Sequence, residues 1–412
     1  MRPAMNADFL DSRNIYRAYI SCRRRKNCTY NAQKFRLRFS QNMVGLTRAL
    51  QEKHYKPGRS ICFVVQNPKP REVFAADFKD RIVHHLLVEE LEKYWEKIFI
   101  FDSYACRKGK GNLAAVERVE HFMRSVSNNG KQKAFFLQID IKNFFMSIDK
   151  NILWSIVQKG IEKQFQDKKR AADVAEVAKI LLFHNPTRNY SDRARAEEWK
   201  LVPSQKSLFY AGENKGLPIG NLTSQFFANV YLNELDQFVK HELKIKCYVR
   251  YVDDIVIIHQ EKKQLAEWLD KIRAFLHEHL KLELKSAVKL AGLSCGINFL
   301  GYVQHIFYRL PRRRVLNNIR IGLKKWSKIN ESRELDFEDL KNLRSSLNSY
   351  LAYAAKAKSF RAMKEIFKPH GWIWKFFKLC GEKVVLKAEY IEAEKQAKFN
   401  RIFGGTYGEV YD

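Results

Sequence analysis

Apolar residues recur along this chain at two spacings, which divide it into helices and short strands. Between Asp80 and Ile98 they return every three or four positions, the spacing of a helix with one buried face. The same spacing predicts helices over residues 8–56, about 150–183, 261–280 and from Pro311 onward. Short runs rich in β-branched residues predict strands at 61–65, 137–141, 255–258, 282–285 and 297–302.

Two adjacent carboxylates, Asp253 and Asp254, stand between two runs of strand-forming residues. Neighbouring residues on a strand point to opposite faces, but a tight turn can place both side chains at one tip. Carboxylate oxygens there would suit a hard divalent cation such as Mg²⁺. An acidic turn without a metal is the ordinary alternative, because Asp is frequent in turns.

A second segment favours the metal. Asp140 lies inside the largely apolar segment 137–149, where an ionised carboxylate is costly unless it is paired or bound to a metal. Three carboxylates that meet could hold two metal ions for an in-line attack on a phosphate.

The charge balance points to a polyanionic partner. The 412 residues include 75 Lys and Arg against 45 Asp and Glu, a net charge of +30, and such an excess most often indicates nucleic acid. A membrane surface is the competing partner, but the basic residues are spread along the chain rather than gathered in one amphipathic helix. Seven irregularly spaced cysteines, no signal pattern and no long apolar run predict a cytoplasmic protein with reduced thiols and no membrane contact.

Several basic clusters are candidate nucleic-acid contacts. The candidates are Arg23, Arg24 and Arg25, then Lys108 and Lys110, and finally Arg312, Arg313 and Arg314. A solvated helix end explains the first of these clusters about equally well, and an ordinary helix-start turn explains the second nearly as well.

Four segments in order resemble the reverse transcriptases: Ile139–Phe145, Gly216–Gln225, Tyr251–Asp254 and Phe299–Tyr302. The resemblance covers roughly residues 10–365 and implies an α+β fold, the right-hand polymerase. The implied activity is that of an RNA-directed DNA polymerase that uses deoxynucleotides. It implies fingers over 1–131, an antiparallel-sheet palm over 132–305 and a helical thumb over 306–370. Residues 155–215 would partly return to the fingers. The stretch 371–412 matches no pattern and is expected to be a C-terminal extension of unknown role.

The resemblance also implies roles for single residues. Asp140, Asp253 and Asp254 would hold two Mg²⁺ ions, for which Mn²⁺ is a possible substitute, and Ile141 would lend its backbone carbonyl. Phe145 would exclude a ribose 2′-hydroxyl, unless it is simply a core aromatic. Further substrate contacts are implied for Lys69, Arg71, Gly220, Gln225, Tyr251 and Lys285, although Lys285 could equally be an ordinary surface lysine. Primer support is implied for Phe299, Leu300, Gly301 and Tyr302.

Ile219 and Gln225 depart from the usual motif, and their form is like that of bacterial diversity-generating retroelements and defence-associated reverse transcriptases. The first interpretation is antiphage defence, with a dedicated noncoding RNA template, dNTP substrates and a DNA product. The second is error-prone copying within a diversity-generating retroelement. A second reverse transcriptase or a small accessory protein would be a further partner. A non-catalytic RNA-binding relic is the third interpretation, and the three intact carboxylates argue against it.

Overall fold

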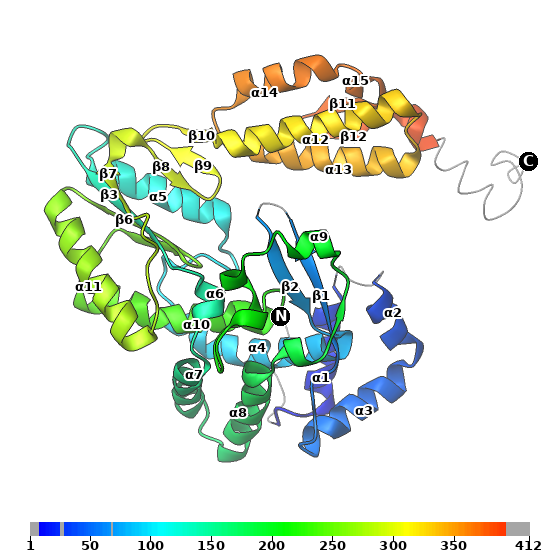
Figure 1. Cartoon of the computed structure of the whole chain (residues 1–412), viewed down its shortest axis with the longest axis vertical. Coiled ribbons are helices and arrows are strands. Elements are labelled where there is room, and N and C mark those ends of the chain that lie inside the picture. The colour runs from blue at the N-terminus through cyan, green and yellow to red at the C-terminus, as the bar shows by residue number, and fades with distance from the viewer. Residues whose placement is uncertain (1–7, 25–28, 67–68, 393–412) are drawn as a thin grey trace, which may run out of the picture. The chain divides into compact units, whose positions relative to one another are not determined.

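The computed structural model describes residues 8–24, 29–66 and 69–392, and the chain divides into two compact units. Unit 1 comprises Met1–Val119 and Phe135–Ala291, and unit 2 comprises Glu120–Ala134 and Gly292–Asp412. The chain therefore enters unit 2 twice, first within helix α5 (Asn112–Val126) and again after Ala291. Figure 1 follows this order from blue to red.

Three helices precede the first strand of unit 1, as the spacing over residues 8–56 predicted. They are α1 (Ser12–Arg23), α2 (Tyr30–Leu37) and α3 (Phe39–Gln51). Asp11 starts α1 because its side chain accepts a hydrogen bond from the backbone N–H of Arg13 at 2.8 Å. Helix α1 packs along α4 (Phe78–Ile98), the predicted helix, whose apolar face is buried.

A small three-stranded sheet follows in unit 1. Strands β1 (Ser60–Val65) and β2 (Arg71–Ala75) are antiparallel. The third strand, β4 (Tyr190–Asp192), comes from far along the sequence and pairs in parallel with β1. Residues near 190 thus join a sheet that begins at residue 60.

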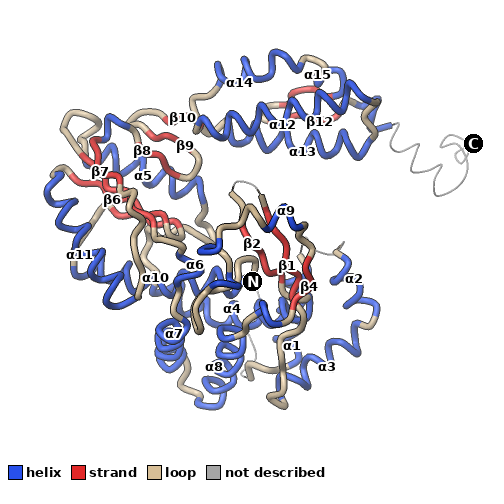
Figure 2. The backbone as a smooth tube through the Cα atoms, in the orientation of Figure 1, coloured by secondary structure: helices blue, strands red, loops and turns tan. Residues whose placement is uncertain are grey.

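The four-stranded sheet of unit 1 carries the candidate carboxylates. Its strands are β5 (Tyr248–Tyr251), β6 (Asp254–His259), β3 (Phe135–Asp140) and β7 (Lys289–Gly292), in that order across the sheet. Strand β6 is antiparallel to both of its neighbours. These strands appear in red at the left of Figure 2. Helix α11 (Lys262–Leu280), the predicted helix, packs against β3 and β6.

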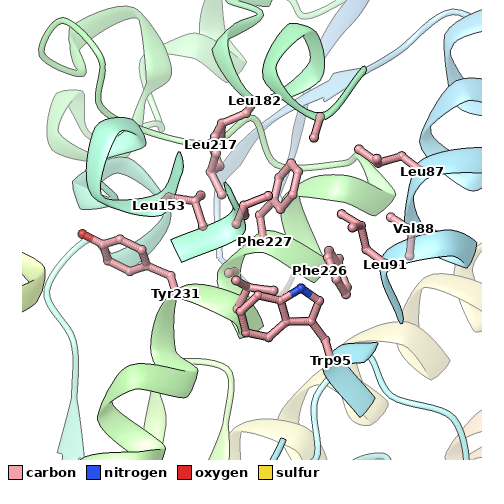
Figure 3. Close-up of a cluster of buried hydrophobic side chains, with 14 of the residues drawn as sticks. Leu87, Val88, Leu91, Trp95, Leu153, Leu182, Leu217, Phe226, Phe227 and Tyr231 are labelled. Carbon is pink, nitrogen blue, oxygen red and sulfur yellow. The ribbon is translucent and has the colours of Figure 1, made fainter. Parts of the chain in front are cut away.

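Helix α10 (Leu222–Gln237) crosses the core of unit 1 and continues into a π-helical turn at Phe238–Glu242. Figure 3 shows its residues Phe226, Phe227 and Tyr231 among side chains of α4, including Leu91 and Trp95. Burial of each such side chain stabilises the fold by roughly 1.5–3 kcal/mol. The same core includes residues of α7 (Lys150–Gln164) and α8 (Lys168–Phe183), both within predicted helical segments.

Shorter elements complete unit 1. They are the helices α6 (Phe144–Ser147) and α9 (Ala196–Trp199) and three 3₁₀ turns at Pro186–Arg188, Ser204–Lys206 and Leu208–Tyr210.

Unit 2 has its own sheet and its own core. The sheet has the order β10 (Arg309–Pro311), β9 (Tyr302–Gln304) and β8 (Ile297–Phe299). The helices are α12 (Arg313–Ser332), α13 (Phe337–Ala354), α14 (Phe360–Phe367) and α15 (Ile373–Phe376). Strands β11 (Phe377–Cys380) and β12 (Lys383–Leu386) form a hairpin whose Phe377 and Leu386 are buried in the helical core.

Two strand predictions were wrong. Residues 282–285 form no strand, and only Leu284 makes a bridge, to Ile141. The run 297–302 is two strands rather than one, because Leu300 (φ 45°) and Gly301 (φ 94°) turn the chain back between β8 and β9. The α+β class is confirmed, and no helix in the described ranges is long and apolar enough to cross a membrane.

Candidate active site

A two-residue turn joins β5 to β6 and places Asp253 at its tip. Tyr251 pairs with Asp254 across the hairpin, which leaves only Val252 and Asp253 in the turn. Val252 has a φ of 55°, a left-handed conformation that β-branched residues rarely adopt. Such strain persists only where the surrounding structure imposes it, and it is concentrated at functional sites.

The end of β3 brings a third carboxylate to this hairpin. Asp140 pairs directly with Asp254 in the antiparallel register, so the two side chains leave the same face of the sheet. Burial, and then the negative charge of Asp140, raise the pKa of Asp253 to about 6. The structure therefore places Asp140, Asp253 and Asp254 at one edge of the sheet.

Two further side chains engage these carboxylates. The Lys285 ammonium lies 2.5 Å from Asp140 Oδ2, and Gln138 Nε2 donates a hydrogen bond to Asp254 Oδ1 at 3.1 Å. The Lys285 backbone N–H also donates to the Asp140 carbonyl at 2.9 Å. Asp140 Oδ1 is buried and accepts no hydrogen bond from the described residues.

The donor set suits a divalent metal ion. Its carboxylate oxygens are hard ligands of the kind that Mg²⁺ prefers, and the buried Asp140 Oδ1 has coordination capacity to spare. Among residues 8–24, 29–66 and 69–392, however, no three His, Cys, Asp or Glu side chains converge as a ready-made metal site. Coordination would therefore require the carboxylates engaged by Lys285 and Gln138 to reorient.

Ile141, the expected backbone ligand of the metal ion, directly follows Asp140 in the chain. It is buried and forms a bridge with Leu284. The hydrogen bonds on either side of this bridge are made by the Asp140 carbonyl and the Lys142 N–H. The Ile141 carbonyl therefore accepts no hydrogen bond in this pairing.

A buried ion pair, which the sequence analysis missed, stabilises the hairpin. Arg250 Nη2 and Asp236 Oδ2 are 2.6 Å apart, and both side chains are fully buried. Tyr248 Oη donates to the same carboxylate at 2.8 Å, and Arg250 Nη1 donates to the Val252 carbonyl at 3.2 Å. Arg250 stands inside an apolar strand just as Asp140 does, and the same reasoning could have identified it.

The segment Gly216–Gln225 docks onto β2. The Phe74 backbone N–H donates to the Ile219 carbonyl at 2.8 Å, and the Ala76 N–H donates to Asn221 Oδ1 at 3.2 Å. Gly220 has a φ of 120°, and a Cβ atom there would lie 2.9 Å from the Phe74 carbonyl oxygen. Only glycine permits this approach, which ties the segment to the strand that begins at Arg71.

Phe145 also belongs to this region of unit 1. Its carbonyl accepts a hydrogen bond from the Leu217 N–H at 2.8 Å, and its half-buried ring packs beside the cluster of Cys62, Phe74 and Leu208. Lys69, Arg71 and Gln225 are exposed, and Tyr251 is half-buried.

The predicted primer-support residues belong to unit 2. Phe299 is buried, and Tyr302 stacks on Tyr353 with ring centroids 4.5 Å apart. Leu300 and Gly301 form the turn between them.

The predicted basic contacts differ in their surroundings. Arg23 is half-buried and Arg24 exposed, whereas Arg25 lies outside the described residues. Lys108 forms an ion pair with Glu92, and Lys110 lies 3.3 Å from the centre of the Phe101 ring. Both lysines therefore already have partners within the protein. Arg312 is half-buried, and Arg313 and Arg314 are exposed at the start of α12.

Comparison with known families gives one match over most of the chain. The family described as "Reverse transcriptase (RNA-dependent DNA polymerase)" matches residues 59–304. This range includes the three carboxylates, the Gly216–Gln225 segment and Lys285.

Individual relatives include a group II intron-encoded protein and an intron maturase. The group II intron-encoded protein LtrA of Lactococcus lactis is 22% identical over 311 residues, which cover 60% of this chain and 46% of LtrA. Nuclear intron maturase 1, mitochondrial, of Arabidopsis thaliana is 21% identical over 192 residues, 40% of this chain and 26% of that protein. The chain thus spans less than half the length of these relatives.

Among solved structures, telomerase from Candida albicans in complex with a fragment of telomeric RNA has a TM-score of 0.45 at 11% identity. The likeness covers 87% of this chain and 62% of the telomerase chain. The family match, rather than this loose likeness, carries the assignment. With it comes the right-hand polymerase fold class that the sequence analysis expected. Because the match extends over more than half of its residues, the chain belongs to the reverse transcriptase (RNA-dependent DNA polymerase) family.

Proposed function

We propose that this protein is an RNA-directed DNA polymerase that adds deoxynucleotides by two-metal phosphoryl transfer. The observation that carries the proposal is the placement of Asp140, Asp253 and Asp254 at one sheet edge, within the range matched by the family. A relic that only binds RNA would have no need of three clustered carboxylates, whose mutual repulsion is costly.

Asp140, Asp253 and Asp254 would hold two Mg²⁺ ions, or Mn²⁺ in their place, with the Ile141 carbonyl as a further ligand. The bound ions would lower the pKa of the primer 3′-hydroxyl and neutralise charge on the triphosphate and the departing pyrophosphate. The protein's own part would be to hold the three carboxylates close together at one sheet edge. The strained Val252 turn and the buried Arg250–Asp236 pair fix that placement.

The remaining substrate roles fall on side chains of unit 1. Arg71 suits bidentate phosphate contact, and Lys69 would add a point charge. The Phe145 ring would exclude the ribose 2′-hydroxyl. Gly220 and Gln225 would line the nucleotide site, Tyr251 would lie beneath the primer end, and Lys285 would donate a proton to the pyrophosphate.

Nucleic acid would contact both units. Phe299 to Tyr302 would support the primer, and Arg23, Arg24, Arg25, Arg312, Arg313 and Arg314 would contact phosphates, with weaker roles for Lys108 and Lys110. The fingers, palm and thumb boundaries of the sequence analysis remain part of this proposal.

For the biological role we propose copying of a dedicated noncoding RNA in antiphage defence, supported by Ile219 and Gln225 in the form Ile-Gly-Asn-Leu-Thr-Ser-Gln. The alternative is a retroelement enzyme, either of a diversity-generating retroelement or of an intron. The intron relatives favour that alternative. Sequencing the RNA that co-purifies from the native host separates the two: a structured RNA encoded beside the gene supports defence, and a template repeat or intron RNA supports a retroelement.

The central experiment is Asp253→Asn. This variant removes one proposed metal ligand at a half-buried hairpin tip, so dNTP incorporation with Mg²⁺ should be abolished while RNA binding persists. Asp270→Asn is a matched control, because Asp270 is an exposed carboxylate of α11 that only pairs with Arg273 at 3.3 Å. Incorporation by the Asp253→Asn variant at the rate of the parent and of Asp270→Asn would refute the two-metal assignment.

A further inference from the structure

Lys285 is fixed beside Asp140 by the backbone as well as by charge. The Lys285 N–H donates to the Asp140 carbonyl at 2.9 Å, and the Lys142 N–H donates to the Glu283 carbonyl at 2.8 Å. These two hydrogen bonds set the register in which Lys285 faces Asp140. The ammonium then lies 2.5 Å from Asp140 Oδ2, so their contact follows from the pairing of two chain segments.

This contact uses an oxygen that a metal ion would need. Asp140 Oδ2 is engaged by Lys285 and Asp254 Oδ1 by Gln138, and the carboxylates of the described residues form no convergent metal group. The other oxygen of Asp140, Oδ1, is buried and accepts no hydrogen bond from any residue in the described ranges. Lys285 and Gln138 thus each occupy a carboxylate oxygen that could otherwise face a metal ion.

We propose that Lys285 competes with the divalent metal ion for Asp140. Its ammonium neutralises the carboxylate cluster when no ion is bound, and it must leave Asp140 Oδ2 before an ion can be coordinated there. The inference rests on the proposed function, because it assumes that Asp140 is a metal ligand.

The chemistry of lysine suits this exchange. Three carboxylates at one sheet edge repel one another, and a nearby cation relieves the repulsion. Lysine is a compact charge on a flexible stem, whereas the planar fork of arginine would hold the carboxylate through two hydrogen bonds. The side chains of Lys285 and Asp140 are 38% and 39% exposed, so the ammonium can move into water.

The same exposure limits the size of the effect. Ion pairs of this kind contribute about 1 kcal/mol at most, because solvent screens them. At about 1.4 kcal/mol per tenfold change in affinity, removal of the ammonium should tighten metal binding by up to about fivefold.

The test measures Mn²⁺ binding to the Lys285→Met variant. Electron paramagnetic resonance of the free ion reports the binding, in the absence of nucleotide and nucleic acid. We expect tighter binding than in the parent, by up to about fivefold, together with a lower unfolding temperature in EDTA. Mn²⁺ should raise that temperature by more in the variant than in the parent. Lys142→Met is a matched control: Lys142 is two residues from Asp140 but pairs with Glu283 at 2.9 Å, so its loss should leave Mn²⁺ affinity unchanged.

A second variant moves affinity in the opposite direction. Lys285→Arg keeps the charge and adds a bidentate grip, so it should bind Mn²⁺ more weakly than the parent. A merely structural lysine would lower the unfolding temperature equally with and without Mn²⁺ and leave affinity unaltered, and that result would overturn the proposal.

Asp140→Asn separates this inference from the function itself. If Asp140→Asn binds Mn²⁺ as the parent does, Asp140 is no ligand and the competition is disproved, while dNTP incorporation by the parent would still support polymerase activity. Absence of incorporation by the parent, with Lys285→Met binding Mn²⁺ more tightly, would instead refute the polymerase and retain the competition.

Discussion

Phe145 is the residue on which the choice of sugar would depend. Phe145 lies in the short helix α6, which is preceded by Asn143 in a left-handed conformation (φ 47°). The Phe145 carbonyl accepts a hydrogen bond from the Leu217 N–H. The ring itself is only half-buried, so it can present an edge to a substrate. Its backbone attachment does not depend on the ring, and truncation of the side chain should leave α6 in place.

Phe145→Ala should therefore admit ribonucleotides. Loss of the ring removes the steric objection to a 2′-hydroxyl, and the preference for dNTP over rNTP should fall by at least about tenfold. Single-nucleotide addition with paired dNTP and rNTP measures this ratio. Phe145→Tyr keeps the ring and should keep the preference. Unchanged selectivity in an active Phe145→Ala variant would make Phe145 a core aromatic only.

Asp253 should make stability depend on pH. Burial and the charge of Asp140 raise its pKa from 3.8 to about 6, so the folded state holds a proton that the unfolded state releases. Binding of this proton stabilises the folded state at low pH. The metal-free protein should therefore become less stable as the pH rises from about 4 to about 6. Urea unfolding in EDTA at about pH 5 and about pH 7 measures the difference. Asp253→Asn should abolish that part of the slope, and a slope that persists there would have another source.

At the scale of elements, the sequence predicted what depends on local pattern. Helices α4 and α11 and the strand around Asp140 follow from apolar spacing, and the Asp253 turn follows from adjacent carboxylates. The Arg250–Asp236 pair depends on a contact between a strand and a helix, which spacing within one element does not encode. Residues 282–285 have the composition of a strand, but only Leu284 finds a partner, and it is β7 that enters the sheet.

Gly220→Ala tests how tightly the Gly216–Gln225 segment is joined to β2. The added Cβ would lie 2.7 Å from Val73 Cγ1 and 2.9 Å from the Phe74 carbonyl oxygen, at a φ that alanine disfavours. The free energy of unfolding should fall by on the order of 2–4 kcal/mol, from strain and overpacking together. Gly212→Ala is the control, because its Cβ would only meet the Lys215 side chain at 3.7 Å. Urea unfolding of both variants decides the matter, and equal stability would mean that the segment can move away from β2.

At the scale of the whole molecule, the net charge of +30 should govern RNA affinity. Arg313 and Arg314 are exposed at the start of α12, where the helix N-terminus adds to their positive potential. Each contact with single-stranded RNA contributes about 0.7 to the slope of log affinity against log salt.

Arg313→Ala/Arg314→Ala should therefore reduce that slope by about 1.4. Lys262→Ala/Lys263→Ala, an exposed pair at the start of α11, removes the same charge and should change the slope less. Fluorescence anisotropy of a labelled single-stranded RNA over a range of salt concentrations gives both values. If both double variants reduce the slope equally, RNA affinity depends on the total charge and not on the cluster of Arg313 and Arg314.

The passage of the chain through unit 2 between Glu120 and Ala134 limits how the protein can be divided for study. That stretch is anchored by partners much later in the sequence: the Leu293 N–H donates to the Ala134 carbonyl at 3.0 Å, and Arg124 Nε donates to the Ile306 carbonyl at 2.9 Å. A recombinant fragment that stops at Ala291 would leave Phe122 and Met123, buried in the intact chain, without the residues that follow Gly292. Such a fragment would expose apolar surface and aggregate, so the two units are better studied by point substitution or by co-expression than by truncation.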